Sequence, residues 1–91
     1  MRKFVIEREI PGVGGADSNK MREVARKSNG VIATLGDDIH WVESYVSGDK
    51  IYCVYLAKDE SVIRKHGEKG GFPVNRVSEV VRMIDPSTAL S

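Results

Sequence analysis

The chain has 91 residues, of which 41% are hydrophobic and 30% are charged, and its formal net charge is +1. These values predict one small soluble domain. Without a clustered excess of Lys and Arg they give no electrostatic argument for nucleic acid or an anionic membrane as a partner. The single cysteine cannot form an internal disulfide, and no apolar run approaches membrane-spanning length, so a cytoplasmic protein is expected.

The sequence begins with a predicted strand at residues 3–10. The even-numbered positions include the apolar residues Phe4, Ile6 and Ile10, whereas the odd-numbered positions hold Val5, Glu7 and Glu9 and are mostly charged. Such alternation is typical of a strand. Pro11 and the glycines after it end this strand, because proline cannot donate to a sheet ladder. A glutamate of this strand that faced inward would need a partner other than Arg8, which points to the opposite face.

A long helix is predicted next, starting at Asp17 or Ser18 as N-cap and ending at Gly36. Apolar and small residues recur within it at three- and four-residue steps, and they form one stripe: Met21, Val24, Ala25, Ser28, Val31, Ile32 and Leu35.

A hairpin follows, with strands predicted at residues 40–46 and 51–57. A two-residue turn would place Ser44 opposite Cys53 and Val42 opposite Tyr55, on the side that faces the helices, with Trp41 on the other side. A three-residue turn would flip this pairing and bring Trp41 beside Tyr55. The first register is preferred, because it gives the helices a mostly small and aliphatic face.

The last third of the chain predicts a second helix and a final strand. Asp59 is the expected N-cap of this helix, and Gly70 and Gly71 end it. Residues 76–84 are predicted as the last strand. The order β-α-β-β-α-β predicts a ferredoxin-like α+β fold, an antiparallel sheet with both helices on one face. A single domain is expected over residues 1–86, and residues 87–91 are expected to fray.

The predicted strand at residues 51–57 is apolar on both of its faces. The two helices can cover only one face of the sheet. A second copy of the chain, packed sheet against sheet, is therefore the expected partner, and the protein is predicted to be a homodimer.

Two histidines are candidates for a metal site or for catalysis. His66 lies on the inward stripe of the second helix, so it is either a packed histidine with a hydrogen-bond partner or a ligand or general base. His40 lies close to Asp37 and Asp38 in the sequence, and imidazole with carboxylate oxygen could hold a divalent cation. The candidate metal residues are His40, His66 and Asp38.

Three residues of the hairpin are candidates for the wall of a pocket: Trp41, Cys53 and Tyr55. Cys53 is interpreted as a small buried hydrophobe, or alternatively as a nucleophile that would need His66 within hydrogen-bond reach. A tyrosine hydroxyl that reaches a pocket could orient a substrate.

A family resemblance is carried by several short segments taken together: His40-Trp41, Ser44-Tyr45-Val46, residues 49–55, Ile63-Arg64-Lys65-His66, Gly71-Phe72-Pro73, Glu79-Val80 and residues 84–88. With these, the sequence resembles a family of small bacterial ferredoxin-like proteins of unknown function that includes nickel-binding members. The resemblance implies a ferredoxin-like homodimer and Ni²⁺ at the protein surface, with His66 and His40 as the imidazole candidates.

The expected function is therefore a small homodimeric protein that binds nickel. Alternatives from another class are a cofactor-independent pocket enzyme, similar to monooxygenases or isomerases with dimeric ferredoxin-like folds, and a small-molecule-binding module. The surroundings of His66 discriminate between these functions. An enclosed cavity with Tyr and Cys in its wall favours the enzyme, and an exposed His beside carboxylates favours the metal.

Overall fold

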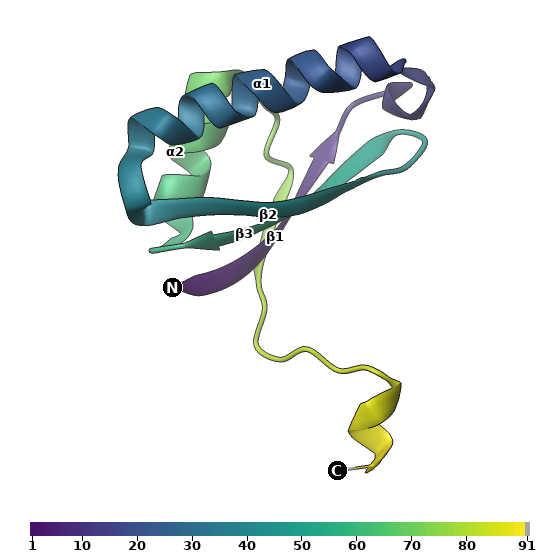
Figure 1. Ribbon diagram of the computed structural model, residues 1–91, viewed down its shortest axis with the longest axis vertical. Coiled ribbons are helices and arrows are strands. Elements are labelled where there is room, and N and C mark those ends of the chain that lie inside the picture. Colours follow the sequence, from purple (N-terminus) through teal and green to yellow (C-terminus); the bar gives the residue numbers. More distant parts are fainter. Residues whose placement is uncertain (91) are drawn as a thin grey trace.

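Both helices lie on the same face of a four-stranded antiparallel sheet (Figure 1). The computed structural model describes residues 1–90. The elements are β1 (Arg2–Glu9), α1 (Ser18–Leu35), β2 (Ile39–Val46), β3 (Lys50–Ala57), α2 (Glu60–Gly70) and β4 (Arg76–Glu79). Short 3₁₀ helices cover Val13–Gly15, Gly36–Asp38 and Pro86–Leu90. The strand order β2-β3-β1-β4 agrees with the predicted ferredoxin-like topology.

The ends of both helices lie where the sequence predicts them. The Asp17 side chain accepts a hydrogen bond from the Lys20 backbone N–H at 2.8 Å, and the Asp59 side chain accepts one from the Val62 N–H at 3.2 Å. Each carboxylate satisfies a backbone donor that the first turn of a helix leaves unpaired. Gly71 follows α2 with a φ of 68°, a conformation that favours glycine.

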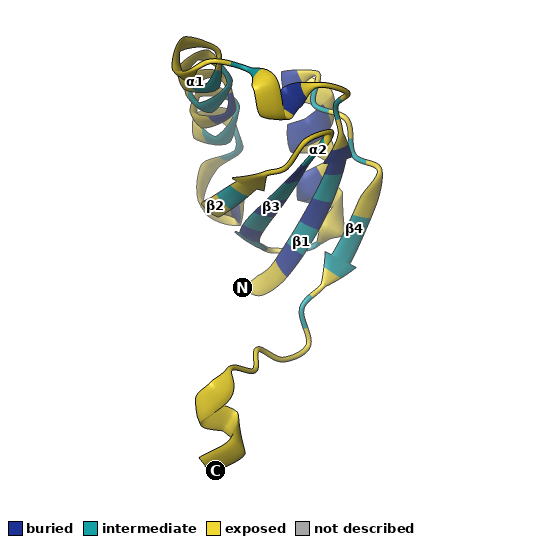
Figure 2. Ribbon diagram, turned by 90° about the vertical axis from the view of Figure 1, so that its right-hand side faces the viewer, coloured by how far each residue is buried: buried dark blue, intermediate teal, exposed yellow. Residues whose placement is uncertain are grey.

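The core lies between the sheet and the helices, where the inward residues of the two central strands are buried (Figure 2). Phe4 and Ile6 of β1 pair with Tyr55 and Cys53 of β3. On the opposite face of the sheet, which we call the outer face, β1 and β3 carry a second apolar set that is only half-buried: Val5, Tyr52, Val54 and Leu56. Neither helix covers the outer face.

The pairing of β2 with β3 corrects the predicted register at one end. Ser44 lies opposite Cys53, as the two-residue turn predicts, but Trp41 rather than Val42 lies opposite Tyr55. A β-bulge between Trp41 and Glu43 absorbs one extra residue, so every residue before the bulge moves to the other face. The prediction that Trp41 faces away from the helices is therefore wrong.

The last strand is shorter than predicted, because β4 ends at Glu79 rather than near Ile84. The final ladder bond joins the Val80 N–H to the Lys3 carbonyl at 2.8 Å. Its antiparallel partner β1 begins at Arg2, so later residues have no strand to pair with. Residues 80–90, which we call the C-terminal arm, run away from the domain (Figure 1). Their fraying beyond residue 86 remains a prediction.

The loop that joins β1 to α1 contacts the hairpin turn closely at Gly14. The Gly14 N–H donates to the Gly48 carbonyl at 2.9 Å, and a Cβ on Gly14 would lie 2.5 Å from the Ser47 carbonyl oxygen. Gly14→Ala should therefore lower the free energy of unfolding by about 1–3 kcal/mol, because backbone must move to make room. Urea unfolding measures this loss. Gly15→Ala is the matched control, with no atom within 4 Å of its Cβ, and equal losses in both variants would contradict the argument.

Neither of the two helices in the described chain is long and apolar enough to cross a bilayer.

Candidate functional site

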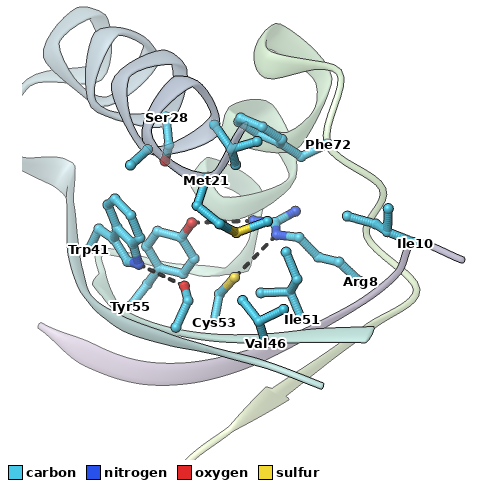
Figure 3. A pocket seen from close by; sticks show the side chains of 13 residues that line it. Arg8, Ile10, Met21, Ser28, Trp41, Val46, Ile51, Cys53, Tyr55 and Phe72 are labelled. Atoms are coloured by element: carbon cyan, nitrogen blue, oxygen red, sulfur yellow. Dashed lines mark hydrogen bonds between the residues drawn. The ribbon is translucent and has the colours of Figure 1, made fainter. Parts of the chain in front are cut away.

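A pocket of about 220 Å³ lies between the first half of α1 and the sheet (Figure 3). Its wall is mostly apolar. The lining residues belong to α1, to the strands β1, β2 and β3, and to the segments that follow β1 and α2. From α1 the small residues Ala25 and Ser28 face the sheet, whereas the larger Ile32 and Leu35 pack on the core further along the helix. Side chains that are too short to reach the sheet explain why space remains here.

Arg8 of β1 lines this pocket, although its side chain is only 3% exposed. Its guanidinium donates to the Pro73 carbonyl at 2.9 Å, to the Tyr55 hydroxyl at 3.3 Å and to the Cys53 thiol at 3.4 Å. It also lies over the Phe72 ring, 5.5 Å from the centroid. None of the ion pairs in the described chain includes Arg8. A buried positive charge is therefore held by neutral groups alone, which is a costly arrangement.

The bulge in β2 brings Trp41 into the pocket wall. Its indole N–H donates to the Ser44 hydroxyl at 2.9 Å (Figure 3). This bond satisfies the polar end of the indole, so the ring offers an apolar surface to the pocket.

His66 of α2 is fully buried and contacts the pocket residues Tyr55 and Phe72. Its Nε2 is 3.0 Å from the Ser28 hydroxyl, and its ring stacks on Phe72 at a centroid distance of 5.4 Å. Its Nδ1 is buried and has no hydrogen-bond partner among residues 1–90. Desolvation, and then the positive charge of Arg8, lower the pKa of His66 to about 4. The imidazole is therefore neutral near pH 7, and its predicted burial with a polar partner is confirmed.

Tyr55 presents its hydroxyl between Arg8 and Ser28. Burial raises the pKa of this phenol above its usual value of 10, and nearby Cys53 adds to the rise, while Arg8 opposes it. The hydroxyl is therefore a neutral hydrogen-bonding group at physiological pH.

The groups in the pocket do not form a catalytic triad. Ser28 and His66 are paired as a nucleophile and base would be, but within the described residues no third group orients Nδ1 of the histidine. A base with a pKa of about 4 removes a serine proton poorly at neutral pH. Cys53 is hydrogen-bonded to Arg8 rather than to His66, so His66 does not serve the thiol as a general base. The arrangement suits binding better than group transfer.

The candidate metal residues lie on opposite sides of the sheet. His40 pairs with Leu56 on the outer face and is exposed, and Asp38 is exposed in the preceding 3₁₀ turn. His66 is buried on the helix side. Within residues 1–90 no group of three or more His, Cys, Asp or Glu side chains could hold a metal ion. The donors of one chain therefore do not fit a closed nickel site.

The three predicted pocket residues Trp41, Cys53 and Tyr55 all line the pocket, and His66 lies next to it. Sequence reasoning missed Arg8, although its parity places it in line with Phe4 and Ile6. The charge of the side chain hid this signal, because an arginine on an apolar strand face is rare.

A family model described as "Nickel responsive protein SCO4226-like" matches residues 4–80. Among solved structures, the crystal structure of SCO4226 from Streptomyces coelicolor A3(2) is similar, with a TM-score of 0.75 and 14% sequence identity. The similarity covers 90% of this chain and 99% of that chain. No curated protein matches the chain. The structural similarity shows a common fold, and the family match extends over most of the sequence.

Proposed function

The chain belongs to the SCO4226-like family of nickel responsive proteins, and its structure contains a pocket. From these two findings we propose that it is a homodimeric binding protein whose pocket binds a small organic molecule. The observation that carries this proposal is the cavity of about 220 Å³, whose wall is mostly apolar but includes the polar side chains of Arg8, Ser28 and Tyr55. Ligand sites typically combine an apolar wall with a few convergent polar groups.

The contacts of the polar groups support binding over catalysis. The Ser28–His66 pair has a weakly basic imidazole, and the Cys53 thiol is engaged by Arg8. A cofactor-independent enzyme would need one of these groups to take or give a proton near neutral pH. The small-molecule-binding alternative needs only their hydrogen bonds.

The pocket is tested with two probes of nearly equal shape, benzoate and benzamide. We expect at least one of them to shift the backbone amide resonances of residues that line the pocket, in an ¹H–¹⁵N spectrum of the full chain. Ala25→Phe should abolish these shifts by filling the cavity. Ala33→Phe, on an exposed turn of the same helix, is the matched control and should retain them. If neither probe shifts the wild-type spectrum, the proposed function is wrong.

The outer face of the sheet and the C-terminal arm support the homodimer. The outer face is apolar at its centre and has no helix over it, and Val81, Met83, Ile84 and Leu90 of the arm are 68–93% exposed. A monomer rarely leaves so much apolar surface in water. In a two-fold dimer each arm would cover the outer face of the other copy, and the buried area would exceed the ~1,000 Å² that a specific interface needs.

Nickel is the second candidate ligand, favoured by the description of the family. Of the candidate metal residues only His40 and Asp38 are exposed, so we propose a weak site at these residues that is completed by the second copy. Imidazole nitrogen is a suitable ligand for nickel, whereas magnesium and calcium prefer oxygen ligands.

Calorimetric titration tests the nickel site. Wild-type protein should bind nickel in preference to magnesium, and His40→Ala should abolish the heat of binding. His66→Gln is the control and should bind nickel as the wild type does, because His66 is buried on the other side of the sheet. A heat of binding that survives in His40→Ala, or no heat at all, would rule the site out.

A further inference from the structure

The pocket contains one full positive charge that nothing in the described chain neutralises. Of the residues that line the cavity, Arg8 alone is charged. A guanidinium has five N–H donors, and only three bonds from it are made, to Pro73, Tyr55 and Cys53. Two N–H donors of this buried cation, one on each terminal nitrogen, therefore have no partner among residues 1–90.

Such a cation is stabilised strongly by an anion that enters the same cavity. Arginine and carboxylate are planar and bind through paired hydrogen bonds, which are shorter and stronger than those between neutral groups. The low polarity of the wall strengthens this attraction, because little water remains to screen it.

The charge of the pocket limits the ligand to one negative charge. Among residues 1–90, no Lys and no second Arg lines the cavity. The nearby His66 is neutral, because burial and Arg8 lower its pKa to about 4. A phosphate or a dicarboxylate would bring a second negative charge that has no partner in this wall, and desolvation of that charge would oppose binding.

The size and lining of the cavity indicate the rest of the ligand. An engineered apolar cavity of about 150 Å³ holds benzene, so about 220 Å³ has room for a ring of that size and a carboxylate. Met21 and Val24 of α1 and the Trp41 ring supply apolar surface for the body of the ligand, and Figure 3 shows the Met21 and Trp41 side chains around the same space as Arg8.

We propose that the ligand of this pocket is a small monocarboxylate with an aromatic or aliphatic body, and that Arg8 binds its carboxylate. This inference rests on the ligand-binding function proposed above, which it makes specific. The Tyr55 hydroxyl, 3.3 Å from a terminal guanidinium nitrogen, is placed to supply a further hydrogen bond to the carboxylate, and the Ser28 hydroxyl lines the same cavity.

Calorimetry with matched probes tests the proposal on the full chain. Wild-type protein should bind benzoate at least tenfold more tightly than the neutral isostere benzamide, and more tightly than phthalate or inorganic phosphate. Arg8→Met keeps the length of the side chain but removes the charge, and should bring benzoate and benzamide to within about twofold of each other. Arg8→Lys retains the charge and should keep part of the preference.

The outcomes separate this inference from the function on which it rests. If benzamide binds as tightly as benzoate, the pocket is a ligand site but the assignment of a carboxylate is wrong. If phosphate or phthalate binds most tightly, the limit to one charge is wrong. If no probe binds, both proposals fail. Because the preference is measured first in the wild type, the test holds even if Arg8→Met does not fold.

Discussion

Removal of residues 81–91 is expected to convert the proposed homodimer to a monomer at micromolar concentration. The arm carries four apolar side chains that are 68–93% exposed in the single chain, and burial of each against a second copy would contribute roughly 1.5–3 kcal/mol. Loss of even half of the summed contribution of the four side chains should raise the dissociation constant of the dimer at least 100-fold, since each 1.4 kcal/mol is a factor of ten. Sedimentation equilibrium of the full and shortened chains measures the change.

The shortened chain should still fold, because the last ladder bond, from Val80 to Lys3, is retained. Its far-ultraviolet circular dichroism should therefore match that of the full chain. The double substitution Val81→Ser and Ile84→Ser is a milder version and should weaken the dimer in the same direction. A full-length chain that is already monomeric, or a shortened chain that is still dimeric, would show that the arm does not join two copies.

A loss of about 2 kcal/mol in the free energy of unfolding between pH 7 and pH 5 is expected from His66 alone. Burial and Arg8 lower the pKa of His66 in the folded chain to about 4, below its ordinary value of 6.5. As pH falls through 6.5, the unfolded chain takes up a proton that the folded chain cannot accept. The stability is complete above pH 6.5 and is lost progressively towards pH 4. Urea unfolding across this range measures the loss.

His66→Gln is the control for this prediction, because glutamine can still reach Ser28 but does not titrate. Its stability should change by less than half as much over the same range. Above pH 5 the carboxylates whose pKa is lowered by hydrogen bonds, such as Asp59 and Glu79, contribute little. A His66 ring proton that titrates in the folded wild type near pH 6.5, followed by NMR, would contradict the lowered pKa.

The fold could be predicted from the sequence because its signals are local. Nearly every boundary follows from three kinds of signal: the helix caps Asp17 and Asp59, the glycines Gly36 and Gly71 that end the helices, and the change of apolar period between helices and strands. The end of β4 is not a local property. Residues 80–84 are as apolar as a strand, but the register of β4 on β1 carries them beyond Arg2, the start of β1, from residue 82 onward, where β1 offers no partner.

The site could be predicted only in part. Trp41, Cys53 and Tyr55 were candidates because of their residue types, but the bulge that turns Trp41 inward adds one residue to a strand and leaves no mark in its pattern. Arg8 had a visible signal in its parity with Phe4 and Ile6. What the sequence did not show is that no carboxylate would accompany it into the core.

A crystal structure of the full chain grown with benzoate would show whether Arg8 holds a carboxylate in the pocket. We expect a benzoate in the pocket between α1 and the sheet, with its carboxylate on the free donors of Arg8 and its ring against Met21 and Trp41. Two results would contradict this expectation: α1 side chains that pack on Cys53 and fill the pocket, or an Arg8 guanidinium paired with a carboxylate of the protein itself.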